Sequence, residues 1–83
     1  MSEISFQFTG NPPEFFKKML FDAVRIGMAD IKQEVLANNG FIRLDYNNPN
    51  DIDLRVSCNN PDVRLKMHVR LEALMRSGKI KLN

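Results

Sequence analysis

The chain has 83 residues, of which 43% are apolar and 27% are charged. It is too short for two domains and too apolar for a disordered chain, so we expect one small domain over residues 1–83. No apolar run approaches the roughly 20 residues of a membrane-spanning helix, and the first residues lack the basic and apolar regions of a signal peptide. The single cysteine, Cys58, cannot form an internal disulfide, so we expect a cytoplasmic protein.

The formal net charge of +2 is unevenly distributed along the chain. Residues 1–60 carry six Lys or Arg against eight Asp or Glu, whereas residues 61–83 carry six against two. The resulting charges are −2 for the first part and +4 for the last part. Any surface that attracts anions is therefore expected in the C-terminal quarter.

Asparagine pairs mark the expected chain reversals. They lie at residues 38–39, 47–48 and 59–60, each between two patterned segments. Asparagine tolerates the left-handed backbone conformation and forms turns through its own side chain. These pairs divide the chain into separate elements.

The chain begins with a predicted strand and a long predicted helix. Residues 4–9 alternate apolar and polar side chains, which is typical of a strand with one buried face. Asn11 is expected to cap the helix that follows, with proline in its first turn. The helix is predicted from about residue 13 to residue 38, with Gly40 as a left-handed cap after its end.

This helix carries more apolar surface than one packing face requires. Its main arc on the helical wheel contains Phe15, Phe16, Met19, Leu20, Ala23, Ile26 and Ile31. The arc is extended by Phe21, Val24, Met28 and Val35. Together they cover about twice the usual apolar width of a surface helix. Either a curved sheet and the C-terminal residues enclose the helix, or these last four residues form a face that binds a second subunit or a partner protein.

A hairpin follows the helix. Residues 41–46 and 52–58 alternate again, with Ile42 and Leu44 among the inward positions, and the turn at residues 47–50 separates them. The acidic and amide side chains of this hairpin resemble a calcium loop only in part, because a calcium loop needs a glycine and a final glutamate that are absent here. A solvated turn is the better interpretation.

The last block allows two interpretations. Residues 63–71 alternate without interruption, which predicts a strand, whereas Asn60-Pro61-Asp62 in front of them is a typical helix start. We give the alternation more weight, with one helical turn at residues 73–77 and a short strand at residues 80–82. The predicted class is α+β with the order β-α-β-β-β, one long helix on a mostly antiparallel sheet; the alternative is β-α-β-β-α.

Two families show similar features. The segment Thr9-Gly10-Asn11-Pro12-Pro13-Glu14-Phe15-Phe16, then Asp22-Ala23-Val24 with Gly27, and finally residues 63–72 resemble the first turn, helix and last strand of the dodecins. Dodecins are oligomers that store flavin, which they stack on a tryptophan, and this chain has no tryptophan. The resemblance thus supports the fold and oligomerisation, and we expect no cofactor. The alternative order β-α-β-β-α resembles that of the DinI family, which modulates RecA filaments.

No catalytic or metal-binding motif is present. Cys58 and His68 are expected on opposite faces of one sheet, so they do not form a nucleophile and base pair. One cysteine and one histidine cannot hold zinc within a chain. The sequence also has no glycine-rich phosphate loop. We therefore expect no enzymatic activity and no metal site.

Cations are frequent on the outward face of the expected sheet. They are Arg43, Arg55, Arg64, Lys66, His68 and Arg70. A basic sheet can follow a phosphate backbone, so these residues are the candidate surface for anions or nucleic acid. Our main expectation is a cytoplasmic, non-enzymatic module that self-associates and binds protein. The alternatives are nucleic-acid binding through the basic C-terminal half and flavin binding by an oligomer.

Overall fold

The fold is α+β, as predicted, and its last element is a helix. The computed structural model describes residues 3–80. Its elements are β1 (Ser5–Thr9), α1 (Glu14–Gly27), α2 (Lys32–Ala37), β2 (Phe41–Asn48), β3 (Asp51–Ser57) and α3 (Pro61–Arg76). The order is therefore the alternative β-α-β-β-α, with the first helix divided in two.

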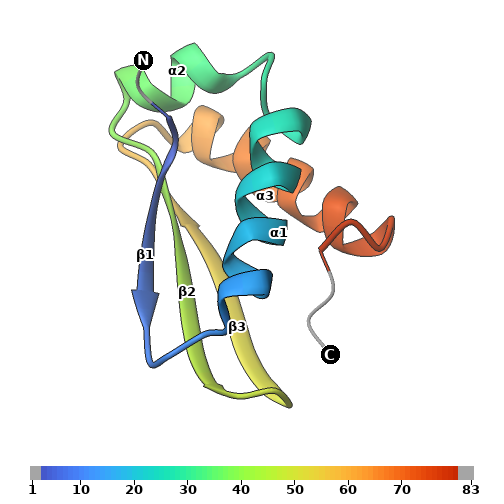
Figure 1. Cartoon of the computed structure of the whole chain (residues 1–83). Helices are drawn as coiled ribbons and strands as arrows, with labels where there is room; N and C mark the ends of the chain where they lie inside the picture. Colours follow the sequence, from blue (N-terminus) through green and yellow to red (C-terminus); the bar gives the residue numbers. More distant parts are fainter. Residues whose placement is uncertain (1–2, 81–83) are drawn as a thin grey trace.

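The three strands form a mixed sheet in the order β1-β2-β3. β1 runs parallel to β2, and β2 runs antiparallel to β3 as the predicted hairpin. A parallel pair needs a long crossover, which α1 and α2 supply. α1 and α3 lie on one side of the sheet, whereas α2 lies beyond the end of the sheet at which β1 begins; the opposite face is bare (Figure 1). The outer edges of β1 and β3 are the two free edges of this sheet.

The long helix predicted over residues 13–38 is interrupted. α1 ends at Gly27, residues 28–31 turn, and α2 begins at Lys32. An unbroken helix of 26 residues would be about 39 Å long, whereas the longest extent of the molecule is 32 Å. The break allows the chain to return to the start of β2 beside β1.

The ends of the first helix also differ from the prediction. Pro13, not Asn11, occupies the cap position of α1, and no side chain caps it. At the end of α2 the left-handed residue is Asn39, with φ 55°, in place of Gly40. Gly40 is instead buried against Val35, where its missing side chain leaves room.

The strand predicted at residues 63–71 is wrong, because this segment is the middle of α3. The Asn60 side chain accepts hydrogen bonds from the N–H groups of Asp62 (2.9 Å) and Val63 (3.3 Å), and Pro61 occupies the first turn. These caps satisfy the start of a helix. The likeness of this segment to the last dodecin strand is therefore not a structural one. The helical turn predicted at residues 73–77 is the last turn of α3, whereas the strand predicted at 80–82 lies largely outside the described residues.

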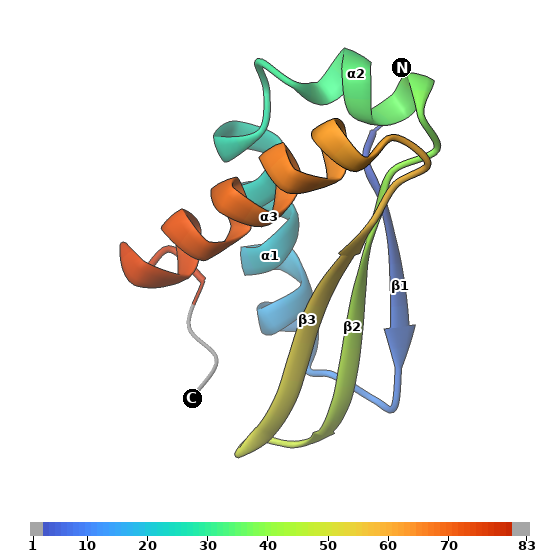
Figure 2. The same cartoon turned by 180° about the vertical axis from the view of Figure 1, so that it is seen from behind.

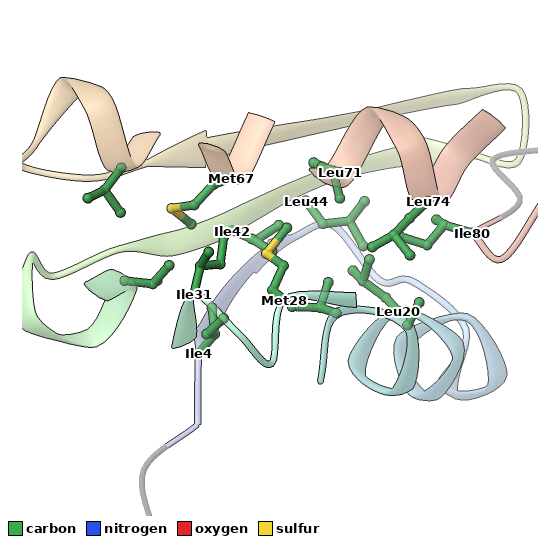
Figure 3. Close-up of a cluster of buried hydrophobic side chains, with 14 of the residues drawn as sticks. Ile4, Leu20, Met28, Ile31, Ile42, Leu44, Met67, Leu71, Leu74 and Ile80 are labelled. Carbon is green, nitrogen blue, oxygen red and sulfur yellow. The ribbon is translucent and has the colours of Figure 1, made fainter. Parts of the chain in front are cut away.

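The core lies between the sheet and the helices. Figure 3 shows side chains of β2, α1 and α3 converging there, and Ile80 joins them after α3. Ile42 and Leu44 of β2 are fully buried, as their inward positions predicted. α1 and α3 approach closely at Gly27, where an added Cβ would lie 2.8 Å from the Leu74 side chain.

Candidate functional site

α3 divides the basic surface that the sequence predicts. Because residues 64–70 are helical, their cations point to different sides and do not share one sheet face. Arg64 and His68 lie on the side next to β3, where they line a groove. Lys66 and Arg70 lie on the other side, toward α1 and α2. The structure thus separates residues that alternation would have kept together.

Lys66 and Arg70 hold α3 against the first part of the chain. The Lys66 ammonium lies 2.9 Å from Glu34. Arg70 donates two parallel hydrogen bonds to the Asp30 carboxylate (2.6 and 2.7 Å) and one to the Gly27 carbonyl (3.0 Å), near the end of α1. These hydrogen bonds lower the pKa of Asp30 and raise the pKa of Arg70. Both cations are therefore engaged within the chain.

Arg43 and Arg55 lie on the bare face of the sheet beside acidic residues. They are direct cross-strand neighbours, and Asp45 and Asp53 form the next pair on the same face. Each arginine donates a hydrogen bond to an aspartate of its own strand, Arg43 to Asp45 (3.1 Å) and Arg55 to Asp53 (2.7 Å). The Thr9 hydroxyl and then Arg43 lower the pKa of Asp45. This group of two cations and two anions has no net charge.

A groove runs between the free edge of β3 and α3. Its lining residues are Leu54, Arg55, Val56, Pro61, Arg64, Leu65 and His68. The lining combines apolar and basic side chains and contains no acidic residue. Arg55 and His68 have acidic partners just outside it, Asp53 and Glu72 (2.7 Å each), whereas Arg64 has no ion pair with any described side chain. We call this feature the β3–α3 groove; Figure 2 shows the side of the molecule where β3 and α3 meet.

Leu65 and Val69 are left on the surface of α3. Their side chains are 62% and 55% exposed, although the alternating pattern predicted both to be buried. Leu65 lines the β3–α3 groove. The structure therefore adds an apolar element to this groove that the sequence analysis assigned to the core.

The predicted partner face of the first helix is mostly core. Val24, Met28 and Val35 are at most 1% exposed, so this part of the prediction is wrong. The turn after α1 and the closeness of α3 enclose these residues. Phe21 is half-exposed, and its ring meets the Phe6 ring edge-on at 4.7 Å. Phe15 and Ile26 were predicted to lie on the main packing face of this helix, but both are exposed.

Aromatic side chains of β1 pack against α1. Phe6 and Phe8 of β1 both pack against Phe21, and the Lys17 ammonium lies 5.5 Å from the centre of the Phe8 ring. The apolar depression beside these rings, at Ile4, measures about 190 Å³. Small-molecule sites usually measure about 300–1,000 Å³. This depression is small for a flavin.

The remaining candidate groups have local partners. The Cys58 thiol donates to the Asn38 carbonyl (3.5 Å), and the His68 imidazole faces Glu72. Cys58 and His68 therefore have separate partners. In the hairpin, the Asn47 amide donates to Asp51 (3.0 Å), as in a solvated turn. Among residues 3–80, no three His, Cys, Asp or Glu side chains converge as metal ligands.

The described helices are also too short or too polar to span a membrane. Neither protein-family models, curated proteins nor solved structures gave a significant match to this chain. The geometry of the β3–α3 groove is therefore the basis for assigning a function.

Proposed function

We propose that this protein is a non-enzymatic module that self-associates and binds protein through the β3–α3 groove. The observation that carries the proposal is the free edge of β3 beside the exposed Leu65. An edge strand offers unpaired N–H and C=O groups, which pair readily with another strand. Apolar side chains beside such an edge add the burial that stabilises association.

β3 carries one feature that protects edge strands, charged side chains (Asp51, Asp53 and Arg55), and lacks others. It has seven residues, whereas β1 has five. It contains no proline. Its pairing with β2 is regular from Ile52 to Ser57, and a shift in register lies between Asp51 and Ile52. Edge strands of monomers are commonly short, bulged or interrupted by proline. β3 is thus the better of the two edges for pairing.

The first experiment is sedimentation velocity of the whole chain from about 1 to 200 µM. We expect a dimer that dissociates on dilution. Leu65→Glu should weaken it, because it places a charge on an apolar contact, and Ile26→Glu is the matched control on an equally exposed residue of α1 (64%). A monomer at every concentration contradicts self-association, and equal weakening by both variants contradicts the use of this groove.

Nucleic-acid binding is the second candidate, favoured by one observation. Arg55, Arg64 and His68 gather at the β3–α3 groove, and no acidic residue is among its lining. This candidate predicts salt-sensitive binding of short oligonucleotides that weakens in the Arg55→Ala/Arg64→Ala variant. Unchanged mobility of an oligonucleotide at low salt would exclude it.

A further inference from the structure

We propose that two copies of the chain pair through β3, antiparallel, about a two-fold axis at Leu54. This inference rests on the proposed self-association and specifies its register and contacts. The two three-stranded sheets would then join into one continuous sheet of six strands. The basis is the order of residues along β3, Asp51-Ile52-Asp53-Leu54-Arg55-Val56-Ser57.

A two-fold interface must be complementary to itself. In antiparallel pairing about Leu54, residues equally far from Leu54 on its two sides lie opposite one another. Asp53 then faces Arg55 of the partner subunit, and Arg55 faces Asp53 of the partner subunit. On the core side, Leu54 faces its own copy, and Ile52 faces Val56 of the partner subunit. Charged residues meet opposite charges and apolar residues meet apolar ones.

The neighbouring registers match less well, because each opposes two like charges at its centre; an axis at Asp53 does also place Asp51 opposite Arg55 of the partner subunit. An axis at Asp53 places two Asp53 carboxylates opposite each other, and an axis at Arg55 places two Arg55 side chains opposite each other. Like charges directly across a strand pair are destabilising. An axis at an intermediate position would join the core face of one sheet to the bare face of the other. Leu54 is therefore the favoured centre.

The pairing inside the chain supports the same conclusion. Within the hairpin, Asp53 lies opposite Asp45, and Arg55 lies opposite Arg43. Directly across the strands, β3 thus faces like charges on β2, and its charged residues pair with opposite charges only along the strand, Arg55 with Asp53 (2.7 Å). A second β3 on the other side would give both residues a cross-strand neighbour of opposite charge.

The β3–α3 groove completes the interface. Leu65 lines this groove together with Leu54 and Val56. Pairing about Leu54 therefore brings the exposed Leu65 of both copies toward the axis. The second copy is the occupant that both the charge order of β3 and this apolar surface favour.

Charge reversal tests the register. Asp53→Arg and Arg55→Asp should each raise the dimer Kd about tenfold or more, because two attractive pairs become repulsive. Both replacements should leave folding intact, since the new Arg faces Asp45 and the new Asp faces Arg43. An equimolar mixture of the two variants should form a heterodimer, and the double variant Asp53→Arg/Arg55→Asp should dimerise again. Native mass spectrometry distinguishes these species by mass.

A second measurement does not depend on charge. Leu54→Cys in a Cys58→Ala background should form an intermolecular disulfide on mild oxidation, because directly opposed residues have Cα atoms about 4.5–5.5 Å apart. A wild-type dimer that tolerates both reversals, or that gives no cross-link at Leu54, overturns this register but leaves self-association standing. A wild-type chain that stays monomeric overturns both.

Discussion

The helical conformation of residues 61–76 predicts that two leucines of the same helix respond very differently to truncation. Leu71 is 2% exposed and Leu65 is 62% exposed. In a strand with the alternation of this sequence, both would face the core and would cost the same. Since both substitutions are Leu→Ala on one helix, their difference in helix propensity cancels.

The expected magnitudes follow from burial. Leu71→Ala removes a buried side chain and leaves a cavity, which costs about 2–5 kcal/mol of unfolding free energy. About two-fifths of the Leu65 side chain is covered, and full burial of a leucine contributes about 1.5–3 kcal/mol. Leu65→Ala should therefore cost about 1 kcal/mol or less. The two variants should differ by about 2 kcal/mol.

Urea denaturation followed by circular dichroism at 222 nm measures this difference. With a slope of about 1 kcal/mol per molar urea for a small domain, the midpoint of Leu71→Ala should fall about 1–2 M below that of Leu65→Ala. The protein concentration is kept where the midpoint no longer depends on it, because Leu65 lies at the proposed interface. Equal losses in the two variants would refute the helix and restore the strand.

Three further predictions concern local structure. Gly10→Ala should abolish folding or lower the free energy of unfolding by several kcal/mol, because Gly10 has φ +80° and an added Cβ would lie 1.8 Å from a carbonyl oxygen of β2. Gly78 is the matched control, with φ +78° and open space around it, and Gly78→Ala should cost only about 1–2 kcal/mol in thermal or urea unfolding. Asn60→Ala should cost about 1 kcal/mol by the same measurement, since its side chain accepts from two N–H groups of the first turn of α3 (2.9 and 3.3 Å). Asp30 has a lowered pKa in the folded state, chiefly through its hydrogen bonds from Arg70, so its contribution to stability is present above pH 4 and is lost as the pH falls further. Wild type should lose more stability than Asp30→Asn between about pH 5 and pH 2, and identical pH profiles would contradict this.

The strands and turns were predictable because short-range signals determine them. Alternation identified β1 and the hairpin, and the asparagine pairs at residues 38–39 and 59–60 lie at chain reversals. Asn47 and Asn48, predicted in the turn, are instead the last residues of β2. The inward positions Ile42 and Leu44 followed directly from the period of two. In these elements local preference and burial agree, so the sequence alone was sufficient.

α3 was mispredicted because two of its apolar residues are not buried. Val63, Met67, Leu71 and Leu74 are buried at helical spacing, whereas the intervening Leu65 and Val69 remain on the surface. Alternation treats all apolar residues as equally buried and therefore indicates a strand. The reliable signal was the start sequence Asn60-Pro61-Asp62, whose bonds the structure contains. Capping depends on adjacent residues only, whereas burial depends on the whole fold.

The basic C-terminal segment shows why net charge alone did not locate a binding surface. Once residues 61–76 are helical, Lys66 and Arg70 are directed at Glu34 and Asp30, and the positive charge of this segment is partly neutralised by the negative first part of the chain. What remains toward β3 is Arg64 beside the apolar Leu65. Two of the basic residues of this segment therefore pair with the acidic first part of the chain and link α3 to it. The same packing leaves the β3 edge and Leu65 uncovered, so the proposed partner would contact α3 and β3, not the apolar face of the first helix.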